Sequence, residues 1–180
     1  HGLAEVTWPT WSDNSNTLYF LGSVDYGPQS PWLDMSSLSF KATYQLYYAN
    51  LSPTHAPLFS MRSDEEEPTQ KNDSNTDNED EPTQPSVFVA EGFGDRITPV
   101  TSEKGHFSHL AGGKGGNLYF LSQFKDDTGA SQTHLMKFDA EERTIAKIAD
   151  KVSEYRLSAD NNAILLKSKE SYRLISAING

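Results

Sequence analysis

Five histidines are the residues of this 180-residue chain with the widest chemical repertoire, since imidazole serves both as a metal ligand and as a general base. They are His1, His55, His106, His109 and His134. Only His106 and His109 lie close in sequence, and a spacing of three on a strand places two side chains on opposite faces. The chain has no Cys and no His-Glu-x-x-His motif. We therefore expect surface or loop histidines, and we assign no metal ligand.

A glycine-rich run resembles a phosphate-binding loop in composition. Residues 112–116 read Gly-Gly-Lys-Gly-Gly. A P-loop requires Ser or Thr directly after the Lys, and it lies between a strand and a helix. Here Gly115 follows Lys114, and an apolar, strand-like run begins at Leu118. The run is better interpreted as a hairpin turn, so we expect no nucleotide and no other cofactor.

Nucleophilic catalysis is not indicated by the serines. The strained turn Gly-x-Ser-x-Gly that typically holds a nucleophilic Ser does not occur, and the lack of Cys excludes a thiolate. Trp8, Trp11 and Trp32 are candidates for a ligand pocket, but we expect them to pack between sheets, as most aromatic residues do. The sequence thus predicts no catalytic, cofactor-binding or metal-binding residue in this chain.

One acidic segment carries most of the charge. Residues 63–82 hold nine carboxylates and a single cation, Lys71, and contribute −8 of the formal net charge of −10. No aliphatic or aromatic residue lies between positions 68 and 85, so little burial is available to offset the entropy of ordering the segment. A Ca²⁺ site or a docking tail is the alternative, but Ca²⁺ loops need a turn Gly and the segment has none. We interpret residues 64–85 as a disordered acidic insertion.

Charge and apolar patterning argue against two classes of partner. A net charge of −10 does not suit a nucleic-acid binder that neutralises phosphates. The longest apolar runs, such as 18–21, span four residues, so we expect no membrane insertion.

Hydrophobic residues still make up 36% of the chain, enough for a core. The lack of Cys does not fix the compartment, and we take the bacterial periplasm as the expectation, with the cytoplasm as the alternative.

Three passages share one pattern, in which an apolar residue is followed by a polar or Gly-rich turn and then by an apolar strand ending in Ser. They occupy residues 11–23, 110–122 and 157–168. Asp, Asn and Gly tolerate the positive φ angles that tight turns require. Each passage therefore predicts a β-hairpin.

The spacing of the passages is typical of propeller blades. Phe107 lies 48 residues before Tyr155, and Leu118 lies 46 residues before Ile164. A period in the high forties with about four strands per unit matches a β-propeller. Leu18 lies 100 residues before Leu118, but that interval holds the acidic insertion, so we predict one enlarged blade there.

The sequence thus predicts an all-β fold, a partial β-propeller of roughly two and a half to three blades of four-stranded antiparallel sheet, with residues 1–180 forming a single domain. The first blade is expected to use strands at 6–13, 17–24, 44–51, 86–90 and 96–101. The second is expected to use 107–111, 117–123, 133–139 and 144–149, and the third 154–159, 163–168 and 172–177. Because so few blades cannot close a ring, we expect a piece of a larger propeller.

The segment 140–157 has a second interpretation. Its apolar residues follow the spacing of an amphipathic helix from Ile145 to Tyr155. The counterpart one repeat earlier contains Gly94 and Pro99, which do not suit a helix. We therefore favour two strands joined by a turn.

Several short motifs occur in an order that resembles a known family. They are Pro-Thr-Trp-Ser-Asp at 9–13 leading to Leu-Tyr-Phe-Leu at 18–21, Tyr-Gln-Leu-Tyr at 44–47, Ser-Met-Arg-Ser-Asp-Glu-Glu at 60–66, Glu-Gly and then Asp-Arg within 88–100, Phe-Ser-His-Leu at 107–110, and the closing stretch 157–177. Their order resembles the C-terminal part of the second β-propeller of tricorn-type serine peptidases, just before the PDZ and catalytic domains. Two features depart from that pattern: residues 89–92, where the family usually has an acidic residue before the apolar one, and the acidic insertion.

The resemblance implies a role without catalysis. In tricorn-type peptidases the propellers form a filter or channel that delivers oligopeptides to a catalytic core beyond the PDZ domain. No residue here matches the motifs of that core, so no catalytic residue is carried over. The implied partners are peptides or other domains of the parent protein, together with self-association through uncovered blades.

Two other classes remain open. A TolB-like or prolyl-oligopeptidase-type propeller, acting as a scaffold that binds proteins or ligands, shares the same hairpin pattern. A free-standing scaffold that assembles only with itself is the third possibility. The residues 64–66 followed by Asp95-Arg96 favour the tricorn resemblance.

Overall fold

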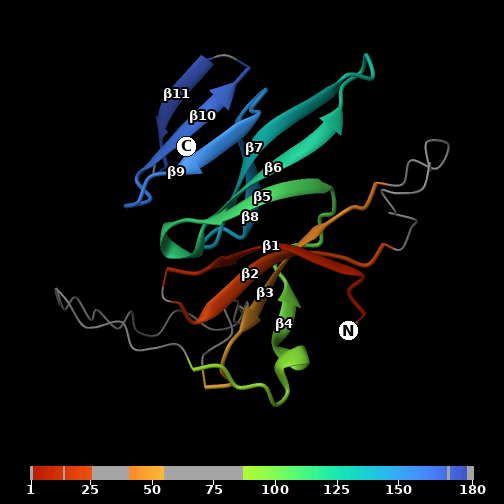
Figure 1. The fold of residues 1–180 in the computed structure, drawn as a ribbon, viewed down its shortest axis with the longest axis vertical. Coiled ribbons are helices and arrows are strands. Elements are labelled where there is room, and N and C mark those ends of the chain that lie inside the picture. The colour runs from red at the N-terminus through yellow and green to blue at the C-terminus, as the bar shows by residue number, and fades with distance from the viewer. Residues whose placement is uncertain (1, 14, 26–40, 55–86, 170, 178–180) are drawn as a thin grey trace, which may run out of the picture.

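Three antiparallel β-sheets lie side by side in the computed structural model of the chain (Figure 1). The structure describes residues 2–13, 15–25, 41–54, 87–169 and 171–177. The acidic insertion predicted at 64–85 lies outside these ranges. In the part of the chain that is described, no helix is long and apolar enough to cross a membrane.

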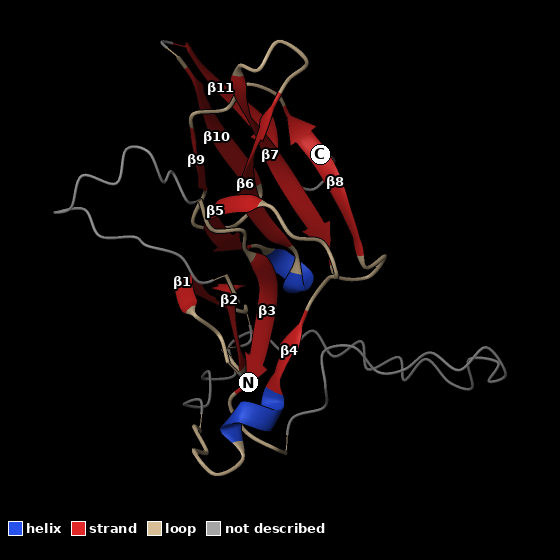
Figure 2. Cartoon of the chain, turned by 90° about the vertical axis from the view of Figure 1, so that its right-hand side faces the viewer, coloured by secondary structure: helices blue, strands red, loops and turns tan. Residues whose placement is uncertain are grey.

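The three sheets, which we call blades 1, 2 and 3, follow one another along the chain. Blade 1 contains β1 (Glu5–Trp11), β2 (Thr17–Ser23), β3 (Gln45–Asn50) and β4 (Ile97–Pro99), in that order. Blade 2 contains β5 (His106–Gly112), β6 (Leu118–Lys125), β7 (Ser131–Asp139) and β8 (Thr144–Ala149). Blade 3 contains β9 (Glu154–Leu157), β10 (Ala163–Ser168) and β11 (Ser171–Ser176). Two single-turn 3₁₀ helices, η1 (Phe93–Arg96) and η2 (Lys114–Gly116), lie outside the sheets (Figure 2).

This architecture confirms the predicted all-β fold, with sheets of four, four and three strands. The segment 140–157 forms β8 and β9 rather than a helix, as the repeat indicates. All three predicted hairpins are present, as β1–β2, β5–β6 and β9–β10.

One predicted strand is wrong. Residues 87–90 are not in a strand, and β4 alone follows β3 in blade 1. The reason is Arg96, whose guanidinium donates hydrogen bonds to the carbonyls of Asn50, Val89 and Glu91. The carbonyls of Val89 and Glu91 are therefore satisfied by a side chain rather than by a β-ladder.

The core lies between the blades, and β6 supplies both halves of it. Leu118 and Phe120 point from β6 towards blade 1, whereas Tyr119 and Leu121 point towards blade 3. This division follows from the alternation of side chains along a strand. All four side chains are at most 3% exposed, and burying residues of this size stabilises the fold by about 1.5–3 kcal/mol each. A continuous apolar run is therefore what a strand packed on both faces requires.

The hairpin turns of the three blades are linked by hydrogen bonds in a row. The backbone N–H of Gly115 in blade 2 donates to a carboxylate oxygen of Asp13 in blade 1, at 2.9 Å. The Lys114 ammonium donates to the side-chain oxygen of Asn162 in blade 3, at 2.7 Å. The polar turn residues thus join neighbouring blades in addition to reversing the chain.

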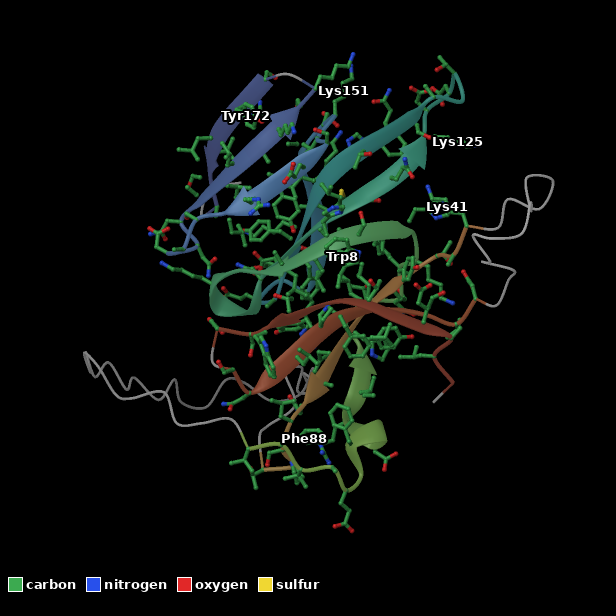
Figure 3. All side chains as sticks on the ribbon, in the orientation of Figure 1. Trp8, Lys41, Phe88, Lys125, Lys151 and Tyr172 are labelled. Carbon is green, nitrogen blue, oxygen red and sulfur yellow. The ribbon has the colours of Figure 1, made fainter. Side chains whose placement is uncertain are left out.

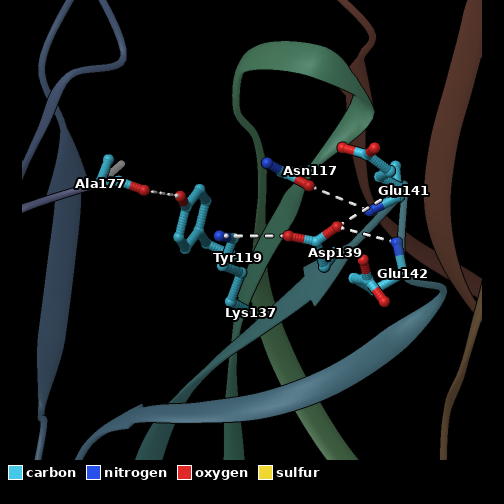
Figure 4. Close-up of polar contacts among 8 residues, drawn as sticks. Asn117, Tyr119, Lys137, Asp139, Glu141, Glu142 and Ala177 are labelled. Atoms are coloured by element: carbon cyan, nitrogen blue, oxygen red, sulfur yellow. Dashed lines mark hydrogen bonds and ion pairs between the residues drawn. The ribbon is translucent and has the colours of Figure 1, made fainter. Parts of the chain in front are cut away.

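The turn between β7 and β8 is organised by one carboxylate (Figure 4). Asp139 accepts hydrogen bonds from the backbone N–H groups of Glu141 and Glu142, at 3.0 and 3.1 Å, and pairs with Lys137. These contacts, with the N–H of Glu142 contributing most, lower the pKa of Asp139. The turn that the sequence predicts here therefore has a local side-chain cause.

Candidate functional site

A groove lies where the first strands of the three blades meet. It is open, has a volume of about 370 Å³, and is lined by Trp8 of β1, by His109 and Ala111 of β5, and by Glu154, Tyr155 and Arg156 of β9. Trp8 lies between β1 and β5 in Figure 3. In a propeller the blades surround a central channel, so the strands that converge face that channel. We call this feature the inner-strand groove.

Two backbone irregularities aim aromatic rings at the inner-strand groove. The pairing of β1 with β2 shifts between Thr7 and Thr10, and that of β5 with β6 shifts between Ser108 and Ala111. Each shift contains a residue with positive φ, Trp8 at 52° and His109 at 54°. This conformation costs a side chain other than Gly about 1–2 kcal/mol. Bulges of this kind re-aim side chains and are frequent near functional sites.

The two re-aimed rings contact each other across the boundary of blades 1 and 2. The indole of Trp8 stacks on the imidazole of His109, with ring centroids 4.3 Å apart and planes inclined by 28°. Trp8 nevertheless remains 40% exposed, and His109 is exposed as well. The pair therefore presents a flat aromatic surface to the groove and to whatever enters it.

A buried phenol holds the floor of the groove in place. The Tyr155 hydroxyl lies 2.5 Å from the carbonyl oxygen of His109 and 2.7 Å from that of Tyr119, so its single proton serves both acceptors. Burial, with a smaller contribution from Tyr119, raises the pKa of Tyr155 far above its ordinary value. Tyr155 therefore remains a hydrogen-bond donor at any physiological pH, and it ties the bulge of blade 2 to blade 3.

The rim of the groove carries charge. The side chain of Arg156 is 81% exposed, and its Nε lies 3.6 Å from a carboxylate oxygen of Glu154. The second carboxylate oxygen of Glu154 lies 3.8 Å from the ammonium of Lys167. Exposed pairs at such distances contribute little, so the guanidinium of Arg156 is held only loosely.

The histidines are spread over separate environments. His106 Nδ1 lies 3.1 Å from the carbonyl oxygen of Ala42, whereas His109 stacks on Trp8. The bulge at His109 interrupts the alternation on which the expectation of opposite faces rests. Within the described ranges, no three His, Asp or Glu side chains gather as metal ligands would. His1 and His55 lie outside those ranges.

His134 forms its own cluster on blade 2. Its ring stacks on Phe124 at 4.1 Å, and its Nδ1 lies 2.7 Å from a carboxylate oxygen of Asp150. Burial lowers the pKa of His134, and the opposing effect of Asp150 is smaller. This cluster is separate from the residues that line the inner-strand groove.

The expectation for the tryptophans is wrong in two cases. Trp8 and Trp11 are 40% and 56% exposed instead of packed between sheets, and Trp32 lies outside the described residues. For Trp8 the cause is the bulge, and Pro9 is the signal that would have indicated it, because Pro within a strand marks an edge or a bulge. No comparable signal marks His109, Tyr155 or Arg156.

Two curated proteins are similar to this chain over most of its length. No family model matches the chain. The tricorn protease homolog of Saccharolobus solfataricus is 27% identical over 170 residues, which is 92% of this chain and 14% of that protein. A putative tricorn-like protease C-terminal subunit of Sulfurisphaera tokodaii is 23% identical over 169 residues, again 92% of this chain and 18% of that protein.

The fold of the chain is similar to that of a tricorn protease of known structure. The chain matches the crystal structure of the tricorn protease with a TM-score of 0.53 at 14% identity, over 96% of this chain and 18% of that one. The chain therefore spans less than a fifth of the length of each of these three proteins. Its similarity to tricorn-type proteases extends over nearly its whole length, which confirms the resemblance that the order of its motifs indicates.

Proposed function

We propose that this chain is a non-catalytic propeller segment of a tricorn-like serine peptidase, from the second propeller, and that it acts in gating oligopeptides. The inner-strand groove is the observation that supports this role most directly. It offers exposed rings from Trp8 and His109 beside the loosely paired Arg156, on the strands that converge in a propeller. Contacts of this type are tolerant of sequence, as a passage for many peptides requires.

The groove does not have the composition of a peptidase active site. Beside the groove, the hydroxyl oxygen of Ser108 lies 3.1 Å from Nδ1 of the adjacent His109, a contact that by itself resembles the one between a nucleophile and its base. Serine peptidases also orient the base with a third group and hold the oxyanion with donors. We therefore assign binding, and not bond cleavage, to this part of the molecule.

Two measurements on the purified chain test this proposal. We expect NMR spectra to show shifts of the Trp8 indole and the His109 imidazole when unstructured peptides of about six to twelve residues are added. We also expect mass spectrometry to find the peptides uncleaved after long incubation. The proposal fails if these peptides leave both rings unaffected, or if cleavage occurs and disappears in the Ser108→Ala variant.

A second candidate role, binding of proteins, is supported by the far face of blade 3. Leu165, Tyr172 and Leu174 are 41%, 65% and 69% exposed and form neighbouring positions of β10 and β11. Tyr172 lies on β11 (Figure 3). Ile164 and Leu166, which alternate with Leu165 along β10, are buried against blade 2. An exposed apolar face of this kind suits another domain of the parent protein or a second copy of the chain.

A further inference from the structure

The inner-strand groove is lined both by a cationic group, Arg156, and by the aromatic surface of Trp8 and His109. Arg156 lines both this groove and a second hollow of about 220 Å³ to which Leu165, Lys167 and Tyr172 also contribute. On this part of the rim Arg156 and Lys167 flank one anion, Glu154. This excess of positive charge contrasts with the net charge of −10 of the whole chain.

The guanidinium of Arg156 is available to an additional anion. Its side chain is 81% exposed, and Glu154 approaches it at Nε, at a distance beyond that of a hydrogen bond. A carboxylate binds a guanidinium best through two parallel N–H···O hydrogen bonds. The side chain of Glu154 is divided between Arg156 and Lys167, so it does not compete strongly for that geometry.

We infer that the inner-strand groove recognises the C-terminal carboxylate of an oligopeptide whose last side chain is apolar. The carboxylate binds the guanidinium of Arg156, and the last side chain lies against the rings of Trp8 and His109. A C-terminal residue suits this arrangement because its carboxylate and its side chain are both attached to the same Cα atom, so they can reach Arg156 and the two rings together. This inference rests on the proposed binding of peptides and adds the feature by which they are selected.

The experiment compares three tetrapeptides on the intact chain by isothermal titration calorimetry. Ala-Ala-Ala-Phe with a free carboxylate, the same peptide with a C-terminal amide, and Ala-Ala-Asp-Phe-amide separate a terminal carboxylate from an internal one. We expect the free acid to bind about tenfold or more tightly than either amide, as a charge-assisted hydrogen bond would give. We expect Arg156→Gln to reduce this ratio to near one, and Glu154→Gln to increase it.

Matched variants keep the result interpretable. Arg173 is exposed on β11 and does not line the groove, so Arg173→Gln should leave the ratio unchanged. Trp8→Leu should weaken the Phe-acid and the Phe-amide by similar factors, because it removes the ring and not the cation. Equal binding of acid and amide, or an unchanged ratio in Arg156→Gln, would overturn the inference while leaving peptide binding intact. Binding of none of the three peptides would overturn the proposed function as well.

Discussion

The phenol of Tyr119 in blade 2 donates a 2.8 Å hydrogen bond to the carbonyl of Ala177, the residue that follows β11 in blade 3 (Figure 4). Both residues are buried, and burial raises the pKa of Tyr119. Tyr19 occupies the corresponding position of the hairpin in blade 1. Its hydroxyl is also buried but has no hydrogen-bond partner among the described residues. The same residue type therefore makes two different contributions in neighbouring blades.

This contrast predicts different costs for the same substitution. Tyr119→Phe leaves the Ala177 carbonyl unsatisfied and should lower the free energy of unfolding by about 1–2 kcal/mol. Tyr19→Phe removes an unpartnered hydroxyl and should be neutral or slightly stabilising. Urea unfolding followed by circular dichroism measures both values. A larger loss in Tyr19→Phe than in Tyr119→Phe would contradict the assignment.

Tyr155 should matter for both stability and the shape of the groove. Tyr155→Phe removes the donor shared by His109 and Tyr119 and should cost about 1–3 kcal/mol. It should also release the bulge at His109, which NMR would detect as a loss of the ring-current shift that Trp8 imposes on the imidazole. Tyr172→Phe is the control, since that side chain is 65% exposed, and an equal effect of the two substitutions would refute the role given to Tyr155.

The loop between β6 and β7 should respond to acid. Asp126 accepts hydrogen bonds from the Thr128 hydroxyl, the Gln132 amide and backbone N–H groups, which together lower its pKa from 3.8 to about 2. Its contribution to stability is therefore complete above pH 3.8 and is lost as the pH falls through about 2. The unfolding free energies of the parent chain and of Asp126→Ala should converge over that interval.

A direct titration of the same group checks the cause. Carbon-detected NMR should place the Asp126 carboxyl below its ordinary range, and Thr128→Val should move its pKa upwards, because the hydroxyl is the largest contributor. An unchanged pKa in Thr128→Val would assign the effect to other donors.

The exposed face of blade 3 predicts self-association. At tens of micromolar we expect a symmetric dimer, because pairing two copies would cover Leu165, Tyr172 and Leu174. Leu174→Glu should give a monomer in sedimentation equilibrium. Val87→Glu places the same charge on another exposed apolar residue and should leave the dimer intact. A monomeric parent chain would rule this prediction out.

Much of the fold could be predicted because its determinants are local in sequence. The turn residues and the doubly buried run at 118–121 indicate hairpins in closely packed sheets. The failure at 87–90 arises because the carbonyls of Val89 and Glu91 accept hydrogen bonds from the side chain of Arg96, seven and five residues further along the chain. The hydrophobic pattern of the run does not report competition from a side chain that lies outside the run.

The candidate site could not be predicted from the sequence, because its residues are far apart along the chain. Trp8, His109 and Arg156 come from three blades, and their proximity is created by packing and by two bulges. Of these features, only the bulge at Trp8 has a signal in the sequence, the neighbouring Pro9. Arg156 reads as an ordinary exposed strand residue until its neighbours are known.

The row of linked turns bears on how such a chain can be rebuilt. Asp13 satisfies a backbone group of the next blade, and Asn162 anchors a side chain from the preceding one. Each repeat thus keeps part of its polar complement in the adjacent repeat. A blade that is transplanted or duplicated alone would lose the hydrogen-bond partners of these turn groups. Recombination between propellers should therefore succeed only when the turns of neighbouring blades are transferred together.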